Sequence, residues 1–100
     1  RAQISDARLL AFFRAVRGAP DVVAVRIVND LLDQGHALDD IFYTGETCGL
    51  ELSVDRTAKS EYVIAFGCVA GPDAGDGGEW TVSYSGDAVE RVHGGLSWVS

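Results

Sequence analysis

Cys48 and Cys68 carry the most reactive side chains of the chain, and both fall within segments that are expected to be strands. Apolar and polar residues alternate over residues 48–54, and residues 62–70 are almost all apolar, which predicts a hairpin. If its loop is symmetric about residue 58, Cys48 lies opposite Cys68, close to disulfide geometry. A nucleophilic cysteine needs a neighbouring base, whereas both cysteines share a face with apolar residues. The sequence therefore favours two buried thiols, with a Cys48–Cys68 disulfide as the alternative.

Two other segments contain residue types that bind metal ions. Residues 36–40 hold one histidine and two aspartates, and residues 73–79 hold three acids among glycines. The first segment has no second histidine nearby, and it follows a helix stop, where such residues serve as turns and caps. The acids of the second are spaced by three, which does not fit the alternating ligands of a calcium loop. The sequence therefore predicts a turn or cap, a solvated loop, no metal site and no cofactor.

His93 is a candidate general acid–base group, but this role requires a carboxylate partner and a cleft. A two-residue turn at Gly86–Asp87 would place His93 opposite Trp80, and a three-residue turn would move it to the other face of the sheet. The sequence contains no nucleophile elbow, no phosphate-binding glycine loop before a helix and no Cys-x-x-Cys pair. It therefore predicts no catalytic residue and favours a protein without enzyme activity.

The elements that position these residues begin with a helix that starts at Ser5. A serine hydroxyl can accept a hydrogen bond from the first-turn amides, and an apolar residue on either side of the cap forms a hydrophobic staple. Gly18 is the expected stop. The side chains that share the core face of this helix are Leu9, Phe12, Phe13 and Val16.

A second helix is expected from Pro20 to the stop at Gly35. Residues 22–28 are rich in β-branched types, so a strand is the competing interpretation. The apolar residues of this segment recur with a period of 3.6 residues, which favours a helix. Its apolar stripe consists of Ala24, Ile27, Val28, Leu31 and Leu32. Its polar arc consists of Arg26, Asn29, Asp30, Asp33 and Gln34.

After Gly35 the pattern becomes that of strands, which are predicted at residues 41–44, 48–54, 62–70, 80–84, 88–93 and 96–99. The glycine-rich residues 71–78 predict a loop. The chain is therefore expected to be one α+β domain over residues 1–100, with two N-terminal helices packed on one face of a four- or five-stranded, mainly antiparallel sheet. The residues expected at the centre of its core are Phe13, Leu31, Leu52, Ile64 and Phe66.

Charge is distributed unevenly along this acidic chain. The net charge is −7, with five arginines in residues 1–26 and seven acids without a base in residues 27–55. A negative surface repels phosphates, so nucleic acid is not expected as a partner. No segment has the roughly 20 apolar residues of a membrane span, so a membrane is not expected either. The composition favours a soluble protein, with the cytoplasm slightly preferred.

An acidic face that binds a basic protein is the function that this distribution favours, as in inhibitors and immunity proteins of nucleic-acid-directed toxins. The negative electrostatic potential of this acidic face should persist unless the first helix folds across it. The alternatives are plain solvation of the acids, or a small-ligand site or small enzyme with a pocket between helices and sheet, lined by aromatic residues and His93. The predicted partner-binding residues are Asp30, Asp33, Asp39, Asp40 and Glu46.

A separate surface on the first helix is predicted to support a homodimer. Leu10 falls off the core face and lies between Arg14 and Arg17. An exposed apolar residue with flanking arginines has the composition of an interface core. If Leu10 were buried within one copy of the chain, the prediction would fail.

Overall fold

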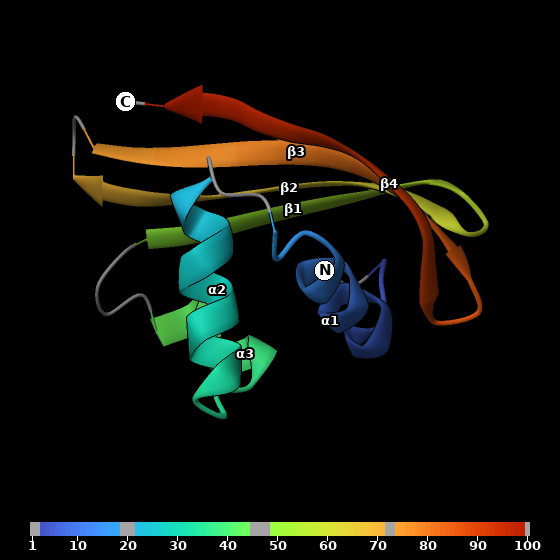
Figure 1. The fold of residues 1–100 in the computed structure, drawn as a ribbon, viewed down its shortest axis with the longest axis horizontal. Coiled ribbons are helices and arrows are strands. Elements are labelled where there is room, and N and C mark those ends of the chain that lie inside the picture. The colour runs from blue at the N-terminus through green and yellow to red at the C-terminus, as the bar shows by residue number, and fades with distance from the viewer. Residues whose placement is uncertain (1–2, 19–21, 45–48, 72–73, 100) are drawn as a thin grey trace.

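In the part of the chain that the structure describes, three helices are followed by a four-stranded antiparallel sheet, and these helices all lie on one side of the sheet (Figure 1). The computed structural model describes residues 3–18, 22–44, 49–71 and 74–99. Each strand is hydrogen-bonded to its neighbour in sequence. The predicted α+β class is confirmed, with one helix more than expected. The elements are α1 (Asp6–Ala15), α2 (Val23–Asp33), α3 (Leu38–Thr44), β1 (Gly49–Ala58), β2 (Glu61–Gly71), β3 (Ala74–Ser85) and β4 (Ala88–Val99).

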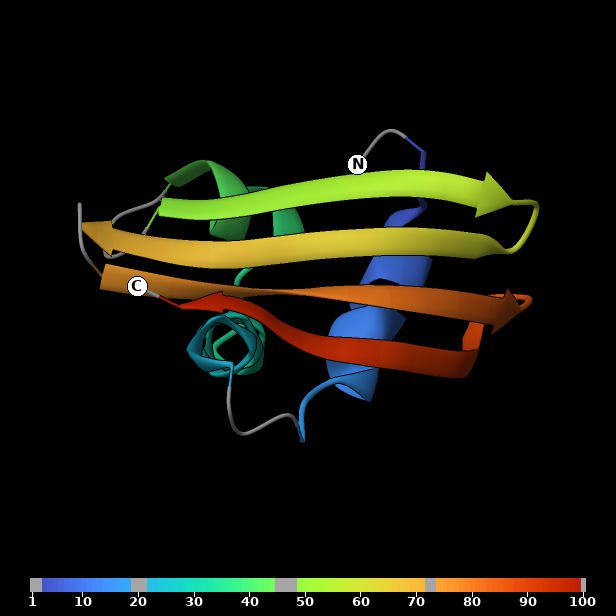
Figure 2. The same ribbon diagram turned by 90° about the horizontal axis from the view of Figure 1, so that it is seen from above.

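Helix α1 begins as its sequence predicts. The Oγ of Ser5 accepts a hydrogen bond from the backbone N–H of Arg8 at 3.2 Å, which satisfies one amide of the first turn. Figure 2 shows α1 crossing beneath the strands, so its core face meets the sheet. The predicted core residues of this helix, Leu9, Phe12, Phe13 and Val16, are all buried.

Arg8 joins α1 to the sheet. Its Nη1 donates to the hydroxyl of Tyr62 at 2.9 Å, and its Nε donates to the carbonyl of Gly86 at 3.1 Å. The hydroxyl of Tyr84 donates to the carbonyl of Arg8 at 2.6 Å. Burial raises the pKa of Tyr84 well above its usual range, nearby Tyr62 raises it further, and the charge of Arg8 opposes the rise. Tyr84 therefore stays protonated and keeps its role as donor.

Residues 41–44 form part of helix α3, so the prediction of a strand there was wrong. Leu38 and Ile41 are both buried, and their spacing of three residues places them on one face of a helix. In a strand the same two residues would point to opposite faces. Asp39 and Asp40 occupy the first turn, where carboxylates stabilise a helix.

The hairpin of β1 and β2 has a register two residues away from the symmetric one. Leu52 lies opposite Phe66 and Leu50 lies opposite Cys68, because the turn falls at residues 59–60 and β1 is irregular between Arg56 and Ala58. A shift by two leaves every side chain on the face that alternation predicts. The predicted position of Cys48 opposite Cys68 depends on the symmetric register, which the structure does not have.

Strand β2 ends at Gly71 and β3 begins at Ala74, so the predicted loop over residues 71–78 was wrong for residues 74–78, and residues 72–73 lie outside the described ones. At Gly78 a glycine fits the sheet because neighbouring groups occupy the space that a side chain would need. A Cβ on Gly78 would lie 2.3 Å from Cη2 of Trp80, whose ring packs across this position. Glycine here permits close packing within a strand.

Strand β4 is one continuous strand rather than the two short ones expected. An irregularity between Ser83 and Tyr84 of β3 shifts its pairing with β4 by one residue, so that His93 lies opposite Thr81 and Gly94 lies opposite Trp80. His93 is therefore on the outer face of the sheet, away from the helices. The β3–β4 hairpin curls towards α1 (Figure 1).

Aromatic rings fill the space between helices and sheet. The ring of Phe66 stacks on Trp80 with centroids 5.0 Å apart and meets the rings of Phe12 and Phe13 edge-on. The predicted burial of Phe13, Ile64 and Phe66 is confirmed. Leu31 and Leu52 are only half-buried, so their placement at the core centre was wrong.

Asp76 of β3 caps helix α2 from a distance of more than 50 residues in sequence. The N-cap residue Val22 has no side chain that can accept a hydrogen bond. Instead, the buried carboxylate of Asp76 accepts from the backbone N–H of Val23 at 2.6 Å and of Ala24 at 3.1 Å. Carboxylates also interact favourably with the positive end of a helix. Pro20, the predicted start of this helix, lies outside the described residues.

Replacing Asp76 by alanine should lower the free energy of unfolding by about 1–3 kcal/mol, because two amides near the sheet lose their acceptor. Urea unfolding monitored by circular dichroism would measure this loss. Asp76→Asn should cost less, since an acceptor oxygen remains. Asp30→Ala is the matched control, because Asp30 is an exposed aspartate of α2, the helix that Asp76 caps. Equal costs for Asp76→Ala and Asp30→Ala would contradict the capping role.

Candidate functional site

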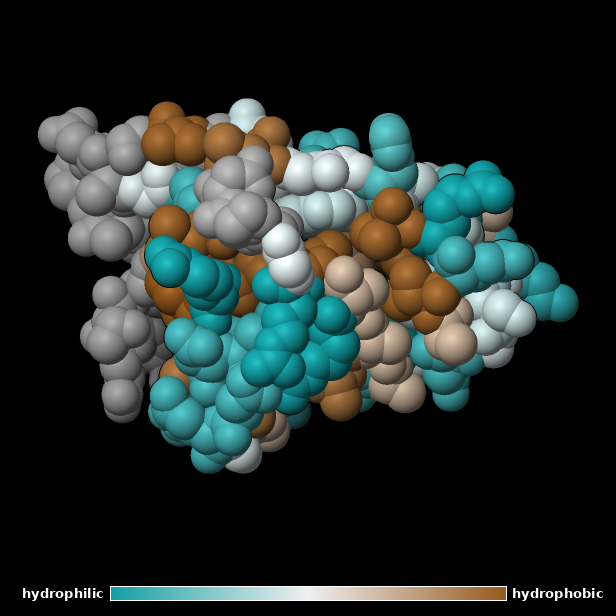
Figure 3. All heavy atoms as spheres, in the orientation of Figure 1, coloured by the Kyte–Doolittle hydropathy of each residue, from teal (hydrophilic) through white to brown (hydrophobic). Residues whose placement is uncertain are grey.

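The acids predicted to bind a partner lie mainly on the helical side of the molecule. Asp30 is exposed on α2, and Asp39 and Asp40 are exposed in the first turn of α3. Hydrophilic residues cover much of the surface around these helices (Figure 3). Glu46 lies outside the described residues.

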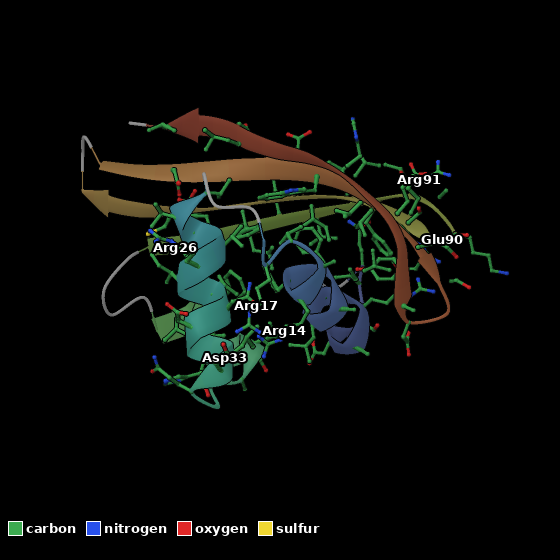
Figure 4. All side chains as sticks on the ribbon, viewed as in Figure 1. Arg14, Arg17, Arg26, Asp33, Glu90 and Arg91 are labelled. Atoms are coloured by element: carbon green, nitrogen blue, oxygen red, sulfur yellow. The ribbon has the colours of Figure 1, made fainter. Side chains whose placement is uncertain are left out.

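Asp33 is neutralised by Arg14 of α1 and by Arg17, which follows α1. Arg14 Nη1 donates to Asp33 Oδ1 at 2.9 Å, and Arg17 Nη2 donates to Asp33 Oδ2. Figure 4 shows these three side chains together between α1 and α2. The side chains of Arg14 and Arg17 therefore reach the predicted acidic face at this point. Asp33 contributes little negative potential, and the acidic surface of the helices is smaller than the sequence suggests.

Asn29 holds Arg14 in this position. The sequence placed Asn29 on the exposed arc of its helix, but its side chain is buried. Its Nδ2 donates to the carbonyls of Phe13 at 3.0 Å and Val25 at 3.1 Å, and its Oδ1 accepts from Arg14 Nη1 at 3.1 Å. The carbonyl of Phe13 lies near the end of α1, where carbonyls lack intrahelical partners. Burial of Asn29 therefore follows from helix packing, which periodicity does not report.

Two glutamates flank a shallow recess on the outer face of the sheet. The recess has a volume of about 390 Å³. Glu51 of β1 lies opposite Gly67 of β2, and Glu79 of β3 lies opposite Ala65 of β2. The two carboxylates therefore stand on either side of β2, whose small residues Ala65 and Gly67 form the floor of the recess. Ser53 and Ser97 add hydroxyl groups to the lining.

Both recess glutamates are exposed, and neither forms an ion pair or side-chain hydrogen bond with another of the residues that the structure describes. The sequence did not bring them together. Glu51 was predicted on the wet face of its strand, but Glu79 was predicted at the end of a solvated loop over residues 73–79. Extending the alternation of β3 back to residue 76 would have placed both on the outer face.

A second groove lies between α1 and the α2–α3 connection, with a volume of about 380 Å³. Leu10 is 40% exposed at this groove, so the condition set for the predicted dimer contact is met. Arg14 lines the groove as well. Arg17 is exposed and binds Asp33.

The two histidines lie on different faces of the molecule. His36 follows α2 and borders the groove, and His93 lies on the outer face of β4. The aromatic residues that were expected to share a pocket with His93 pack against one another in the core instead. The hypothesis of a ligand pocket lined by these aromatics and His93 therefore loses its geometric basis.

Cys68 is buried on the inner face of β2, as predicted, but it is disulfide-bonded, so the favoured prediction of a free thiol at this position was wrong. Cys48, the other cysteine of the chain, lies outside the described residues. A bonded sulfur is not available as a nucleophile. The Cys48–Cys68 pairing remains a prediction.

Within the described ranges, no group of three or more histidine, cysteine and acidic side chains is arranged to hold a metal ion. The described helices include none that is long and apolar enough to cross a membrane. Comparisons with protein-family models, curated proteins and solved structures find no significant match to this chain. The recess and the groove are therefore the candidate sites on the described surface.

Proposed function

We propose that this chain is a non-catalytic protein-binding domain that receives a basic segment of a partner on its acidic outer sheet face. The observation that carries the proposal is the recess between Glu51 and Glu79. Its two carboxylates have no cation partner among the described residues, and the helices cover the opposite face of the sheet. Such a domain would act as inhibitors and immunity proteins do, by covering a basic surface of its partner.

The floor of the recess leaves room for a long cationic side chain. Ala65 and Gly67 project little or nothing from β2, whereas the glutamates rise from the strands on either side. Two strand spacings separate these strands by about 10 Å, so a lysine or arginine lying over β2 can reach both carboxylates. Arginine fits best, because its planar guanidinium donates to two acceptors at once.

The acids on the helices would contribute to the encounter rather than to the contact. The net charge of −7 attracts a basic partner over several ångströms, and exposed charges outside a contact change mainly the association rate. Asp30, Asp39 and Asp40 keep this proposed role. Asp33 does not, because Arg14 and Arg17 compensate its charge.

A short arginine-rich peptide can serve as the probe, with binding followed by NMR of the ¹⁵N-labelled protein. We expect saturable amide shifts centred on residues 51–53, 65–67 and 79, which weaken strongly at about 0.5 M salt because the Debye length falls below 5 Å. The double substitution Glu51→Gln and Glu79→Gln should weaken binding at least about tenfold, since each lost charged hydrogen bond is worth roughly 1.5–3 kcal/mol.

The matched control removes two acids from the helical side, Asp30→Asn and Asp39→Asn. It changes the net charge by the same amount and should reduce the affinity much less. If the two double variants lose affinity equally, the peptide responds to net charge alone and the recess is not the site. If the shifts centre on α2 and α3, the acidic face of the helices is the site instead.

A further inference from the structure

Three residues of α1 form a stripe at the edge of the groove. Asp6, Leu10 and Arg14 follow one another at intervals of four residues, so they lie on one face of the helix, one turn apart. All three line the groove. The stripe therefore presents an acid, an exposed apolar side chain and a base in a row.

The remaining lining of the groove is mostly apolar or small. Leu32 of α2 and Leu38 of α3 lie across from α1, with residues 35–37 between these helices. An exposed leucine next to such a lining is the arrangement of an apolar anchor beside its receiving pocket. Gly35 and Ala37 project little, which leaves space for an incoming side chain.

Arg14 is held rigidly, with one edge of its guanidinium open. Both of its hydrogen bonds, to Asn29 and to Asp33, use Nη1. Nη2 and Nε have no hydrogen-bond partner among the described residues. A guanidinium fixed along one edge can bind a second carboxylate along the other with little further loss of freedom.

We propose that this groove is a self-association surface, in which α1 of one copy packs antiparallel to α1 of a second copy about a twofold axis near Leu10. Asp6 and Arg14 are each four residues from Leu10, on opposite sides. Reversing the helix therefore sets Asp6 of each copy against Arg14 of the other, with the two Leu10 side chains between them. A twofold interface requires this kind of self-complementary surface.

Charge explains why a second copy is the occupant. Two copies that each carry a net charge of −7 repel one another over most surfaces. The stripe is locally neutral, so it is a surface on which the copies can approach. The groove lies on the helical side of the molecule, away from the recess of Glu51 and Glu79, so this inference does not depend on the proposed function.

Sedimentation velocity over a range of concentrations up to about 1 mM, where weak contacts are detected, provides the test. We expect a reversible dimer of the 10.6 kDa chain. Leu10→Asp should raise its dissociation constant at least about tenfold, because a charge replaces the apolar anchor. The matched control is Leu96→Asp, since Leu96 on β4 is 42% exposed against 40% for Leu10. It should leave the dissociation constant unchanged within about twofold.

A mixing experiment tests the pairing itself. Asp6→Arg and Arg14→Asp should each lower self-association, and an equimolar mixture should recover it, because opposite charges then face one another across the axis. Circular dichroism identifies loss of folding, which is a concern for Arg14→Asp because Arg14 binds Asn29 and Asp33. A wild-type chain that stays monomeric at about 1 mM overturns the proposal. Equal weakening by Leu10→Asp and Leu96→Asp, or a folded mixture without recovery, also overturns it.

Discussion

Replacing Phe66 by alanine is expected to lower the free energy of unfolding by about 3–5 kcal/mol. Phe66 is 3% exposed, and its ring contacts those of Phe12, Phe13 and Trp80. It is therefore the ring at which α1 meets two strands of the sheet. The substitution removes both the buried surface of the ring and its edge-to-face contacts, and it leaves a cavity between elements that cannot easily collapse.

Urea denaturation monitored by tryptophan fluorescence would measure this loss, because Trp80 stacks on Phe66. Val99→Ala is a suitable control, since Val99 is 65% exposed and should change stability by no more than about 0.5 kcal/mol. A cost for Phe66→Ala close to that of the control would show that the aromatic cluster is not the centre of the core.

Gly94→Ala should cost about 2–5 kcal/mol, through two effects that act together. Gly94 has a backbone φ of +139°, a conformation that residues other than glycine rarely adopt. In addition, a Cβ at this position would lie 2.2 Å from the carbonyl oxygen of Glu79 on the neighbouring strand. The alanine must therefore both strain the backbone and push β4 away from β3.

The adjacent glycine provides the control for this prediction. A Cβ on Gly95 would meet nothing within 4 Å. Gly95→Ala should accordingly change stability little, and thermal unfolding of the two variants would compare them directly. Similar melting temperatures for both variants would mean that β4 tolerates a side chain at Gly94 and that the close approach to β3 is not needed.

The features that sequence predicted well depend on local signals. The cap at Ser5 and the core face of α1 follow from residues within one or two turns of one another, and the structure has both. The strand pattern of residues 62–70 was equally clear, because a central strand is covered by neighbours whatever their register. Alternation fixes the face of each side chain even where the pairing is wrong by two.

The errors arose where distant residues decide the local structure. Residues 41–44 have types that favour a strand, but Ile41 is buried in a helix beside Leu38. The glycines of residues 74–78 suggest a loop until the ring of Trp80 is placed across Gly78. The face of His93 depends on one irregularity in the pairing of β3 and β4. Each of these outcomes is a property of tertiary contacts that periodicity does not contain.

The candidate site was predicted only in part. Asp30, Asp39 and Asp40 are exposed as expected, and Leu10 is exposed beside Arg14. The neutralisation of Asp33 required the relative placement of two helices, although the sequence already indicated that the first helix could compensate the acidic run. The recess between Glu51 and Glu79 required the register of three strands, which is the least local information in the fold.

The capping of α2 by Asp76 also sets an order in which the chain can fold. An isolated helix of 11 residues without a cap of its own is too short to be stable in water. Asp76 follows Val23 by 53 residues. Its carboxylate therefore reaches the helix only after the chain has closed a long loop and β3 has paired with β2. During synthesis, α2 therefore leaves the ribosome well before Asp76, the residue that caps it. The second helix becomes stable together with the sheet, and not before it.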